Sequence, residues 1–301
     1  MKIAYLVLAH DSPRHLERLV GALSSSSSAL FIHIDKKSRL SRFPHFSGDG
    51  IVVSRERIPV YWADFSIVEA TLILLRQALA DPRRFDYFVL LSGCDYPLQP
   101  ASYIERFFES NRGAEFINIV EMPCEAARKP IARLLNYRPY PGIPSAIRLG
   151  RRLLVAAGLI PRTRDYRPHF GGLLPFGGSQ WWALSRDACE YVRSFVDSKP
   201  RLADFYRNTF CPDESFFHTI LGNSPFRARM RRNVTYADWS AGGPHPARLN
   251  CSHIERFADA PAVVLDDVYG SGEALFARKF SDMEQSVVAR LDELLISKGA
   301  A

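Results

Sequence analysis

Two adjacent carboxylates, Asp213 and Glu214, stand in the stretch RNTFCPDESFFHTIL at residues 207–221. They follow a proline and precede an apolar run. One explanation is a helix start, because proline suits the first helical position and carboxylates are favoured at the positive end of a helix dipole. The other is general-base catalysis, in which a carboxylate takes the proton from a reacting hydroxyl. The stretch alone leaves both interpretations open.

A pair of adjacent cations, Arg278 and Lys279, lies in the stretch FARKF. Arginine offers a planar fork to two phosphate oxygens, and lysine offers a compact point charge. The sequence contains no Asp-x-Asp triplet, no GxxxxGKS/T loop and no HExxH pair. We therefore expect no metal, and a nucleotide-using enzyme with this sequence would neutralise a diphosphate with such cations. A solvated basic spot beside a C-terminal helix is the alternative.

Other candidate contacts each have a structural alternative. Asp35, in FIHIDKK, follows a predicted buried strand, where it would bind a nucleobase or ribose, or close a turn. Trp62, in VYWADFS, and Trp181–Trp182, in GGSQWWALS, offer stacking surfaces for a base or a sugar, or fill a core. Gly177 and Gly178 permit a close backbone approach to a ligand, or a tight turn.

The elements that must position these residues alternate along the first hundred positions. Apolar runs and helical periodicity predict strands at 2–10, 29–36, 50–55 and 85–98, with helices at 12–23 and 64–80. This rhythm is typical of a doubly wound, mostly parallel α/β sheet. Ligands bind outside the carboxyl ends of such strands. The polar residues at those ends are His10, Asp11, Asp35 and Asp95.

A basic segment interrupts the second half of the chain. Residues 125–170 contain ten Lys or Arg against two acids, so the segment carries +8 and the rest of the chain −1. The segment has six prolines and one predicted helix, at 145–159. We expect a single domain, 1–301, with a nucleotide-binding half at 1–123, a basic insertion at 124–170 and an acceptor-binding and catalytic half at 171–301. The insertion is a candidate site for an anionic acceptor or an acidic membrane surface, or else a solvated loop.

Composition narrows the class of protein. Hydrophobic residues make up 47% and charged residues 24%, which indicates a globular protein rather than a disordered one. The five scattered cysteines have no CxxC spacing and support neither a disulfide framework nor a zinc site. The N-terminal apolar run lacks a cleavage site, and no stretch is long and apolar enough to span a membrane. We expect a soluble, cytoplasmic protein that does not bind nucleic acid, because its excess charge lies in one segment.

Eight stretches together carry a family resemblance. The chain resembles the core-2/I-branching β-1,6-N-acetylglucosaminyltransferase and peptide O-xylosyltransferase family, as a soluble bacterial-type member. The matching stretches, between about residues 3 and 282, are AYLVLAHD, FIHIDKKS, VYWADFSIVEATLILL, FVLLSGCDYPL, GGSQWWALSR, CPDESFFHTIL, YADWS and FARKF. Their order matches the family, and the basic segment is the poorly matched gap.

The resemblance implies a GT-A-type fold and an inverting, metal-independent transfer from a UDP-sugar. It assigns the catalytic base to Glu214 and the diphosphate contacts to Arg278 and Lys279. We then expect Glu214 to lie in the first turn of a helix, kept ionised by the helix dipole and aimed outward. Asp213 would serve the helix end.

The resemblance also places the donor nucleotide. Asp35 would contact uracil, Leu8 would pack against the base, Trp62 would lie near the uridine, and Asp95 would lie close to the donor site. Substrate contacts are expected from Ser179, Gln180 and Trp181. Some family members carry Asp or Ala in place of Gln180, which puts the donor-sugar contacts there in doubt.

The expected function is transfer of N-acetylglucosamine or xylose from a UDP-sugar to a hydroxyl of a glycan, lipid-linked or peptide acceptor. UDP-sugar is a co-substrate, and no cofactor is implied. The inner membrane surface would be a peripheral contact. The alternative is a catalytically silent UDP-sugar or glycan-binding protein on the same fold.

Overall fold

The core of the protein is a seven-stranded sheet. The computed structural model describes residues 1–139, 145–243 and 245–300. The strand order is β3-β2-β1-β4-β7-β6-β8. Only β7 runs against its neighbours, and the other six strands share one direction. The strands are β1 (Ile3–Ala9), β2 (Ser28–Ile34), β3 (Ile51–Val53), β4 (Tyr87–Ser92), β6 (Glu115–Glu121), β7 (Phe176–Ser185) and β8 (Met230–Arg231).

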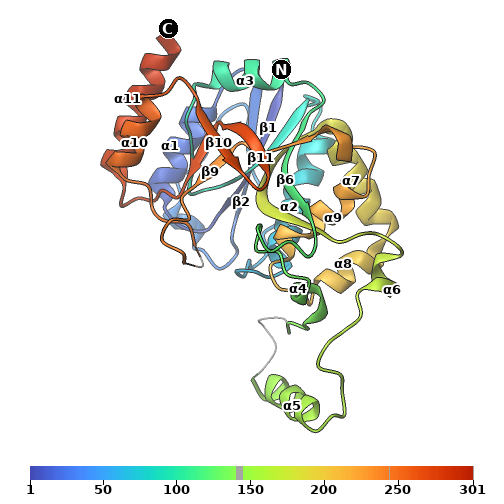
Figure 1. Cartoon of the computed structure of the whole chain (residues 1–301). Coiled ribbons are helices and arrows are strands. Elements are labelled where there is room, and N and C mark those ends of the chain that lie inside the picture. Colours follow the sequence, from blue (N-terminus) through green and yellow to red (C-terminus); the bar gives the residue numbers. More distant parts are fainter. Residues whose placement is uncertain (140–144, 244, 301) are drawn as a thin grey trace.

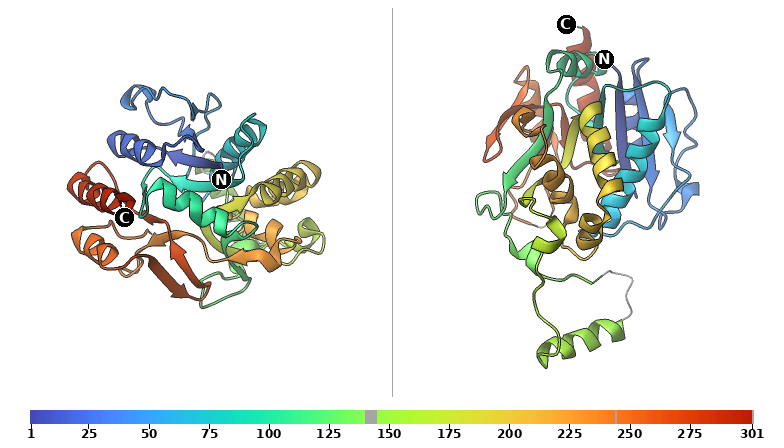
Figure 2. Two further views of the ribbon diagram at one scale, coloured as in Figure 1. Left: turned by 90° about the horizontal axis from the view of Figure 1, so that it is seen from above. Right: turned by 90° about the vertical axis from the view of Figure 1, so that its right-hand side faces the viewer.

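Helices cover both faces of this sheet (Figures 1 and 2). On β1, Tyr5 and Leu6 point into different hydrophobic clusters, because successive strand side chains alternate between faces. The Tyr5 face packs on α1 (Pro13–Leu23), α3 (Ala101–Ser110), α10 (Cys251–Ala258) and α11 (Gln285–Ala300). The Leu6 face packs on α2 (Ser66–Ala80), α7 (Arg186–Ser198), α8 (Pro200–Tyr206) and α9 (Phe216–Gly222). The strands are covered on both sides, which explains their continuous apolar runs.

Smaller elements lie around this core. A three-stranded sheet has the order β5-β12-β9 and is formed by β5 (Asp95–Pro97), β12 (Phe276–Arg278) and β9 (Thr235–Ala237). A hairpin is formed by β10 (Val263–Asp267) and β11 (Gly270–Ala274). Single 3₁₀ turns are η1 (Leu40–Arg42), η2 (Pro212–Glu214) and η3 (Arg227–Arg229). The predicted fold class, a mostly parallel α/β sheet flanked by helices, is confirmed.

The basic insertion at 124–170 contains α4 (Ala132–Leu135), α5 (Ser145–Ala156) and α6 (Arg167–Phe170). Its residues 140–144 lie outside the described part of the chain. The predicted helix is confirmed as α5, which stands apart from the body at the opposite end from the N-terminus (Figure 1). No described helix has the length and apolar character needed to cross a membrane. The expected division at residues 123 and 170 stays a prediction.

Candidate active site

Glu214 lies in a short turn ahead of a helix. Pro212–Glu214 form the 3₁₀ turn η2, and α9 begins at Phe216, after Ser215 leaves helical geometry at φ −145°. Glu214 thus lies in the first turn of a 3₁₀ helix, and the prediction that this turn opens the following α-helix is wrong. Asp213 is buried, its Oδ1 has no hydrogen-bond partner among the described residues, and no side chain caps α9. The predicted role of Asp213 at the helix end is wrong as well.

Two cations from the basic insertion bind the Glu214 carboxylate. Lys129 Nζ lies 2.5 Å and Arg133 Nη1 2.6 Å from Glu214 Oε2. Burial by itself would raise the pKa of Glu214, but the two positive charges outweigh burial and hold that pKa below its ordinary value. The carboxylate is therefore kept ionised by an ion-pair cluster, in place of the predicted helix dipole.

The second oxygen of the same carboxylate is open. Both cations contact Oε2, and within the described chain no group hydrogen-bonds to Oε1. The Glu214 side chain remains 26% exposed, whereas Lys129 is only 8% exposed. One oxygen is thus anchored by cations, and the other is available to accept a hydrogen bond from a bound molecule.

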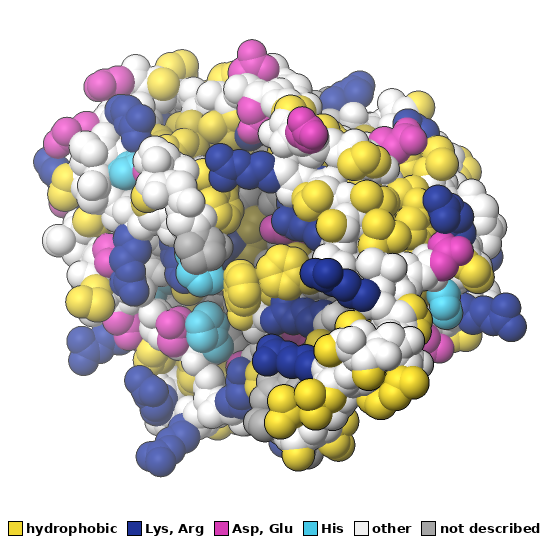
Figure 3. All heavy atoms as spheres, turned by 60° about the horizontal axis from the view of Figure 1, so that its bottom comes forward, with side chains coloured by type: hydrophobic (Ala, Val, Ile, Leu, Met, Phe, Trp, Pro, Cys, Tyr) yellow, Lys and Arg dark blue, Asp and Glu magenta, His cyan; other side chains and the backbone are white. Residues whose placement is uncertain are grey.

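A cavity of about 730 Å³ adjoins this cluster. Lys129 and Arg133 line it, together with Arg128, Ile131 and Phe210. Its wall is therefore both basic and apolar. The face of the molecule at this end is hollowed near its centre, and Lys and Arg side chains gather around the hollow (Figure 3).

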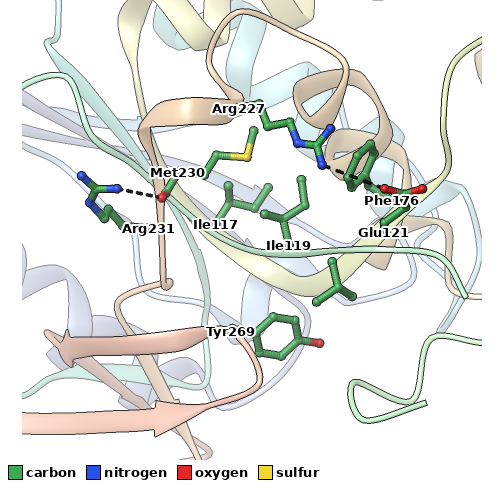
Figure 4. A pocket seen from close by; sticks show the side chains of 9 residues that line it. Ile117, Ile119, Glu121, Phe176, Arg227, Met230, Arg231 and Tyr269 are labelled. Atoms are coloured by element: carbon green, nitrogen blue, oxygen red, sulfur yellow. Dashed lines mark hydrogen bonds and ion pairs between the residues drawn. The ribbon is translucent and has the colours of Figure 1, made fainter. Parts of the chain in front are cut away.

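A second cavity, of about 280 Å³, lies against the edge of the sheet. Figure 4 shows Ile117, Ile119 and Met230 along it, with Tyr269 at one side. None of the predicted site residues lines it. Tyr269 lies in the turn between β10 and β11. Burial raises the pKa of its phenol, and the negative charge of Glu214 raises it further.

Arg278 forms a cluster with Asp95 and Trp181. The small sheet pairs Arg278 with Asp95 across β12 and β5. The Arg278 Nε lies 3.4 Å from Asp95 Oδ1, and its guanidinium carbon lies 4.0 Å from the centre of the Trp181 ring. Burial raises the pKa of the fully buried Asp95 to about 6, against the opposing pull of Arg278. The guanidinium is therefore fixed between a carboxylate and an aromatic face.

Lys279 follows at the end of the same strand. Its backbone carbonyl accepts a hydrogen bond from Leu249 N, and its side chain is half-buried. No carboxylate among the described residues pairs with its ammonium. The Lys279 charge also acts on Asp95, so it belongs to the neighbourhood of Arg278.

A bulge in β7 links the two clusters. Gly178 pairs with Ile119 and Trp182 with Ile117, so Ser179, Gln180 and Trp181 lie opposite the single residue Asn118. Such bulges redirect side chains and are frequent beside active sites. The predicted substrate contacts Ser179, Gln180 and Trp181 are the three residues of this bulge.

Contacts with α9 and β6 hold the bulge in place. His218, on α9, is buried and donates from Nε2 to the Ser179 carbonyl at 2.9 Å. Burial and then the Lys129 charge lower the pKa of His218 to about 3, so the ring stays neutral. A Cβ on Gly178 would lie 1.6 Å from the Asn118 carbonyl oxygen. Gly178 is thus needed for strand packing, which neither interpretation from the sequence included.

Strand β7 contacts both the Glu214 cluster and the Arg278 cluster, which limits the distance between them. Gly177 lies beside Glu214 and Lys129, since a Cβ there would be 3.3 Å from the Glu214 carbonyl oxygen and 3.3 Å from Lys129 Cγ. Trp181 contacts Arg278. Four residues of extended chain span at most about 14 Å. Glu214 and Arg278 therefore flank one short stretch of strand.

The remaining predicted residues lie at the strand ends. Asp35 directly follows β2 and is buried; its Oδ1 accepts hydrogen bonds from Lys37 N at 2.8 Å and Val60 N at 3.3 Å. In this structure the Asp35 carboxylate therefore closes a turn, as in the structural alternative. Leu8, near the end of β1, is half-buried, and its carbonyl accepts from Gly93 N.

Trp62 is 55% exposed and belongs to the Glu214 side of the site. Its ring packs edge-on against Phe210, with centroids 5.9 Å apart, and Phe210 also lies under Arg133. Arg138 donates hydrogen bonds to the carbonyls of Trp62 and Ala63. The core-filling alternative for Trp62 is therefore wrong.

Lys129 and Arg133 were missed by reasoning from the sequence. They lie in KPIAR, inside the basic insertion, and the one available signal was their four-residue spacing. In the described part of the chain, no group of three His, Cys, Asp or Glu side chains is placed to hold a metal ion.

The chain is similar in sequence to a family of known enzymes. Residues 3–258 match the family described as core-2/I-branching enzyme. Xylosyltransferase 2 of Rattus norvegicus is 28% identical over 313 residues, covering 97% of this chain and 33% of that protein. Xylosyltransferase 1 of Rattus norvegicus is 28% identical over 249 residues, covering 80% of this chain and 28% of that protein. The chain thus spans about a third of the length of these relatives.

Among solved structures, the apo form of mouse xyloside xylosyltransferase 1 aligns with 91% of this chain and 97% of its own chain. The sequence identity is 12% and the TM-score is 0.31.

Proposed function

This chain belongs to the core-2/I-branching enzyme family, and on that premise we propose that it is a glycosyltransferase that moves xylose or N-acetylglucosamine from a UDP-sugar to an acceptor hydroxyl. The observation that carries the proposal is that one bulged strand, β7, lies beside Glu214 and its partner Lys129 at Gly177 and beside the Arg278 guanidinium at Trp181. A base and a phosphate-binding cation are the two groups that the reaction requires.

The proposed reaction is a single displacement. The acceptor oxygen attacks the anomeric carbon from the face opposite UDP and forms the new glycosidic bond. The bond between that carbon and the diphosphate oxygen breaks, and UDP leaves with the bonding electrons. Glu214 Oε1 takes the proton of the acceptor hydroxyl. Because the attack comes from the face opposite UDP, the anomeric configuration inverts. A positioned base typically contributes about 10²–10⁴-fold to the rate.

Charge on the departing diphosphate would be offset by Arg278 and Lys279. Asp95 and Trp181 fix the Arg278 guanidinium before substrate arrives, and preorganised charges stabilise a transition state without further reorganisation. Lys279 adds a second positive charge that no described carboxylate occupies. These two cations take the role that a metal ion has in many other nucleotide-sugar enzymes, so we propose a metal-independent transfer.

The acceptor would enter through the cavity lined by Lys129, Arg133 and Phe210. Arginines and the exposed Trp62 ring beside it suit a glycan, peptide or lipid-linked acceptor that carries negative charge. Asp35, Leu8 and Ser179–Trp181 remain the proposed contacts of the uridine and the sugar. A cytoplasmic location is part of the same proposal.

The direct test is incubation with a panel of UDP-sugars, with and without candidate acceptors, scored by UDP release. We expect release from one donor, stimulated by an acceptor. Calorimetric binding of a UDP-sugar without UDP release, with any glycan, peptide or lipid-linked acceptor, would instead support the silent binding protein.

A further inference from the structure

Helix α5 exposes a set of large apolar side chains. Ile147, Leu149 and Leu153 are 61%, 58% and 62% exposed, and Leu154 is 43% exposed. Helices of the body turn such residues into the two hydrophobic clusters, but none of these four belongs to either cluster. The right-hand view in Figure 2 and the view in Figure 1 show α5 held away from the body. Exposed apolar surface of this kind marks an interaction site.

The helix is two-sided. At 100° per residue, Leu149 and Leu153 lie on the side opposite Arg151. The Arg151 guanidinium lies 3.9 Å from the centre of the Tyr137 ring, which belongs to the base of the arm. The leucine side therefore faces away from Tyr137, toward solvent.

The arm that carries α5 is uniformly positive. Residues 137–162 contain five arginines and no acidic residue. A protein surface that covered this arm would have to be acidic around an apolar centre. The surface of an anionic bilayer offers both features at once, with acidic headgroups above an apolar interior.

The arm has a fixed base. Its two ends meet in a bridge between Asn136 and Thr163. Next to this bridge Arg164 donates to the carbonyls of Leu134 and Phe205, and its guanidinium stacks 3.8 Å from the Phe205 ring. The arm is thus attached to the body through a half-buried arginine.

We propose that α5 docks on an acidic lipid bilayer, with its leucine side in the interface and Arg151 and Arg152 on the side of the headgroups. Basic amphipathic helices lie in the plane of such interfaces, where apolar burial and attraction to anionic lipid add together. Docking needs neither donor nor acceptor, so it stands or falls independently of the glycosyltransferase proposal.

The test is flotation of the full chain with vesicles of phosphatidylcholine alone, or with about one third phosphatidylglycerol. We expect binding to the anionic vesicles at least about tenfold above binding to neutral ones, falling as salt rises. The variant Leu149→Gln/Leu153→Gln, which keeps good helix formers, should lose about tenfold of that binding. The matched control Met283→Gln/Ile296→Gln changes side chains that are 83% and 73% exposed elsewhere, and should bind as wild type.

Two results would overturn the proposal. One is equal binding of wild type and Leu149→Gln/Leu153→Gln to anionic vesicles. The other is absence of binding to the anionic vesicles. A concentration-dependent dimer that the same variant abolishes in analytical ultracentrifugation would then assign the apolar side of α5 to a second copy of the chain.

Discussion

Glu214 is set apart from an ordinary surface carboxylate by its two cations. Lys129 and Arg133 keep it charged in a partly buried position, and both contact Oε2, so Oε1 carries no hydrogen bond from the described residues. The lowered pKa makes Glu214 a weaker base. The two cations also fix the orientation of its carboxylate and keep it ionised in mildly acidic solution. Both cations come from the basic insertion at 124–170.

The first prediction concerns the pH dependence of this carboxylate. Lys129 and Arg133 lower the pKa of Glu214, so wild-type activity should persist as pH falls to below the ordinary glutamate pKa. Lys129→Met removes one cation while burial remains, so the Glu214 pKa rises. The acid limb of the pH profile of kcat/KM should shift upward by about one unit or more.

Arg162→Met is the matched control, because it removes one exposed charge from the same segment without a contact to Glu214. Its acid limb should coincide with that of wild type. Superimposable profiles for Lys129→Met and Arg162→Met would show that Glu214 is not the titrating base.

At this scale the sequence proposes Glu214 and Arg278 from short local motifs, and their roles stay predictions. It failed for the helix start, because a contact remote in the chain decides it. Ser215 Oγ donates to the Phe176 carbonyl and lies 2.8 Å from the Tyr206 hydroxyl, which holds Ser215 outside helical geometry. Neither partner is visible from the local pattern of 207–221.

At the scale of elements, the bulge in β7 decides where the substrate contacts lie. It brings Ser179–Trp181 out of register with β6, and the absence of a side chain at Gly178 lets the Asn118 carbonyl approach. Bulges of this kind insert residues without a sequence signal of their own, since the alternation of the flanking strand residues continues.

Gly178→Ala should therefore be strongly destabilising. Its Cβ would lie 1.6 Å from a backbone oxygen, so the strands must separate, and we expect a loss of about 3 kcal/mol or more in urea unfolding. Gly21→Ala is the control: it lies inside α1 with nothing within 4 Å, and should gain ~0.5–1 kcal/mol. Equal stabilities of the two variants would contradict the packing described for β7.

The base of the α5 arm gives a second prediction for an element. Arg164→Met removes the hydrogen bonds to the Leu134 and Phe205 carbonyls, so the arm should detach locally. Limited trypsin digestion should then cleave between residues 137 and 162 about tenfold faster than in wild type. Arg162→Met, at the exposed neighbouring position, should leave the rate of cleavage at the remaining sites unchanged. An unchanged rate for Arg164→Met would show that other contacts hold the arm.

For the molecule as a whole, the first hundred residues were predictable because buried parallel strands leave continuous apolar runs. The antiparallel direction of β7 was not predictable, since both directions give the same run. The pairing of Arg278 with Asp95 was also hidden, because it joins strands more than 180 residues apart. Helix α5 was predicted from its helical periodicity. Its separation from the body was not, because periodicity does not show whether another element packs on the helix.

The response of the whole molecule to nucleotide tests the metal-independent part of the proposal. UDP at about a hundredfold over its Kd should raise the Tm by roughly 5 °C. Because Arg278 and Lys279 are proposed to bind the diphosphate, the shift should be the same in EDTA. A shift that disappears in EDTA and returns with Mn²⁺ would contradict that role.

The central claim is that Glu214 removes the acceptor proton at a site where Arg278 holds UDP. The most direct measurement compares Glu214→Gln with wild type, by calorimetric UDP affinity and by sugar transfer to the acceptor. We predict an unchanged UDP affinity and a rate of transfer lower by about a hundredfold or more. Transfer within tenfold of the wild-type rate, with UDP still bound, would contradict the account.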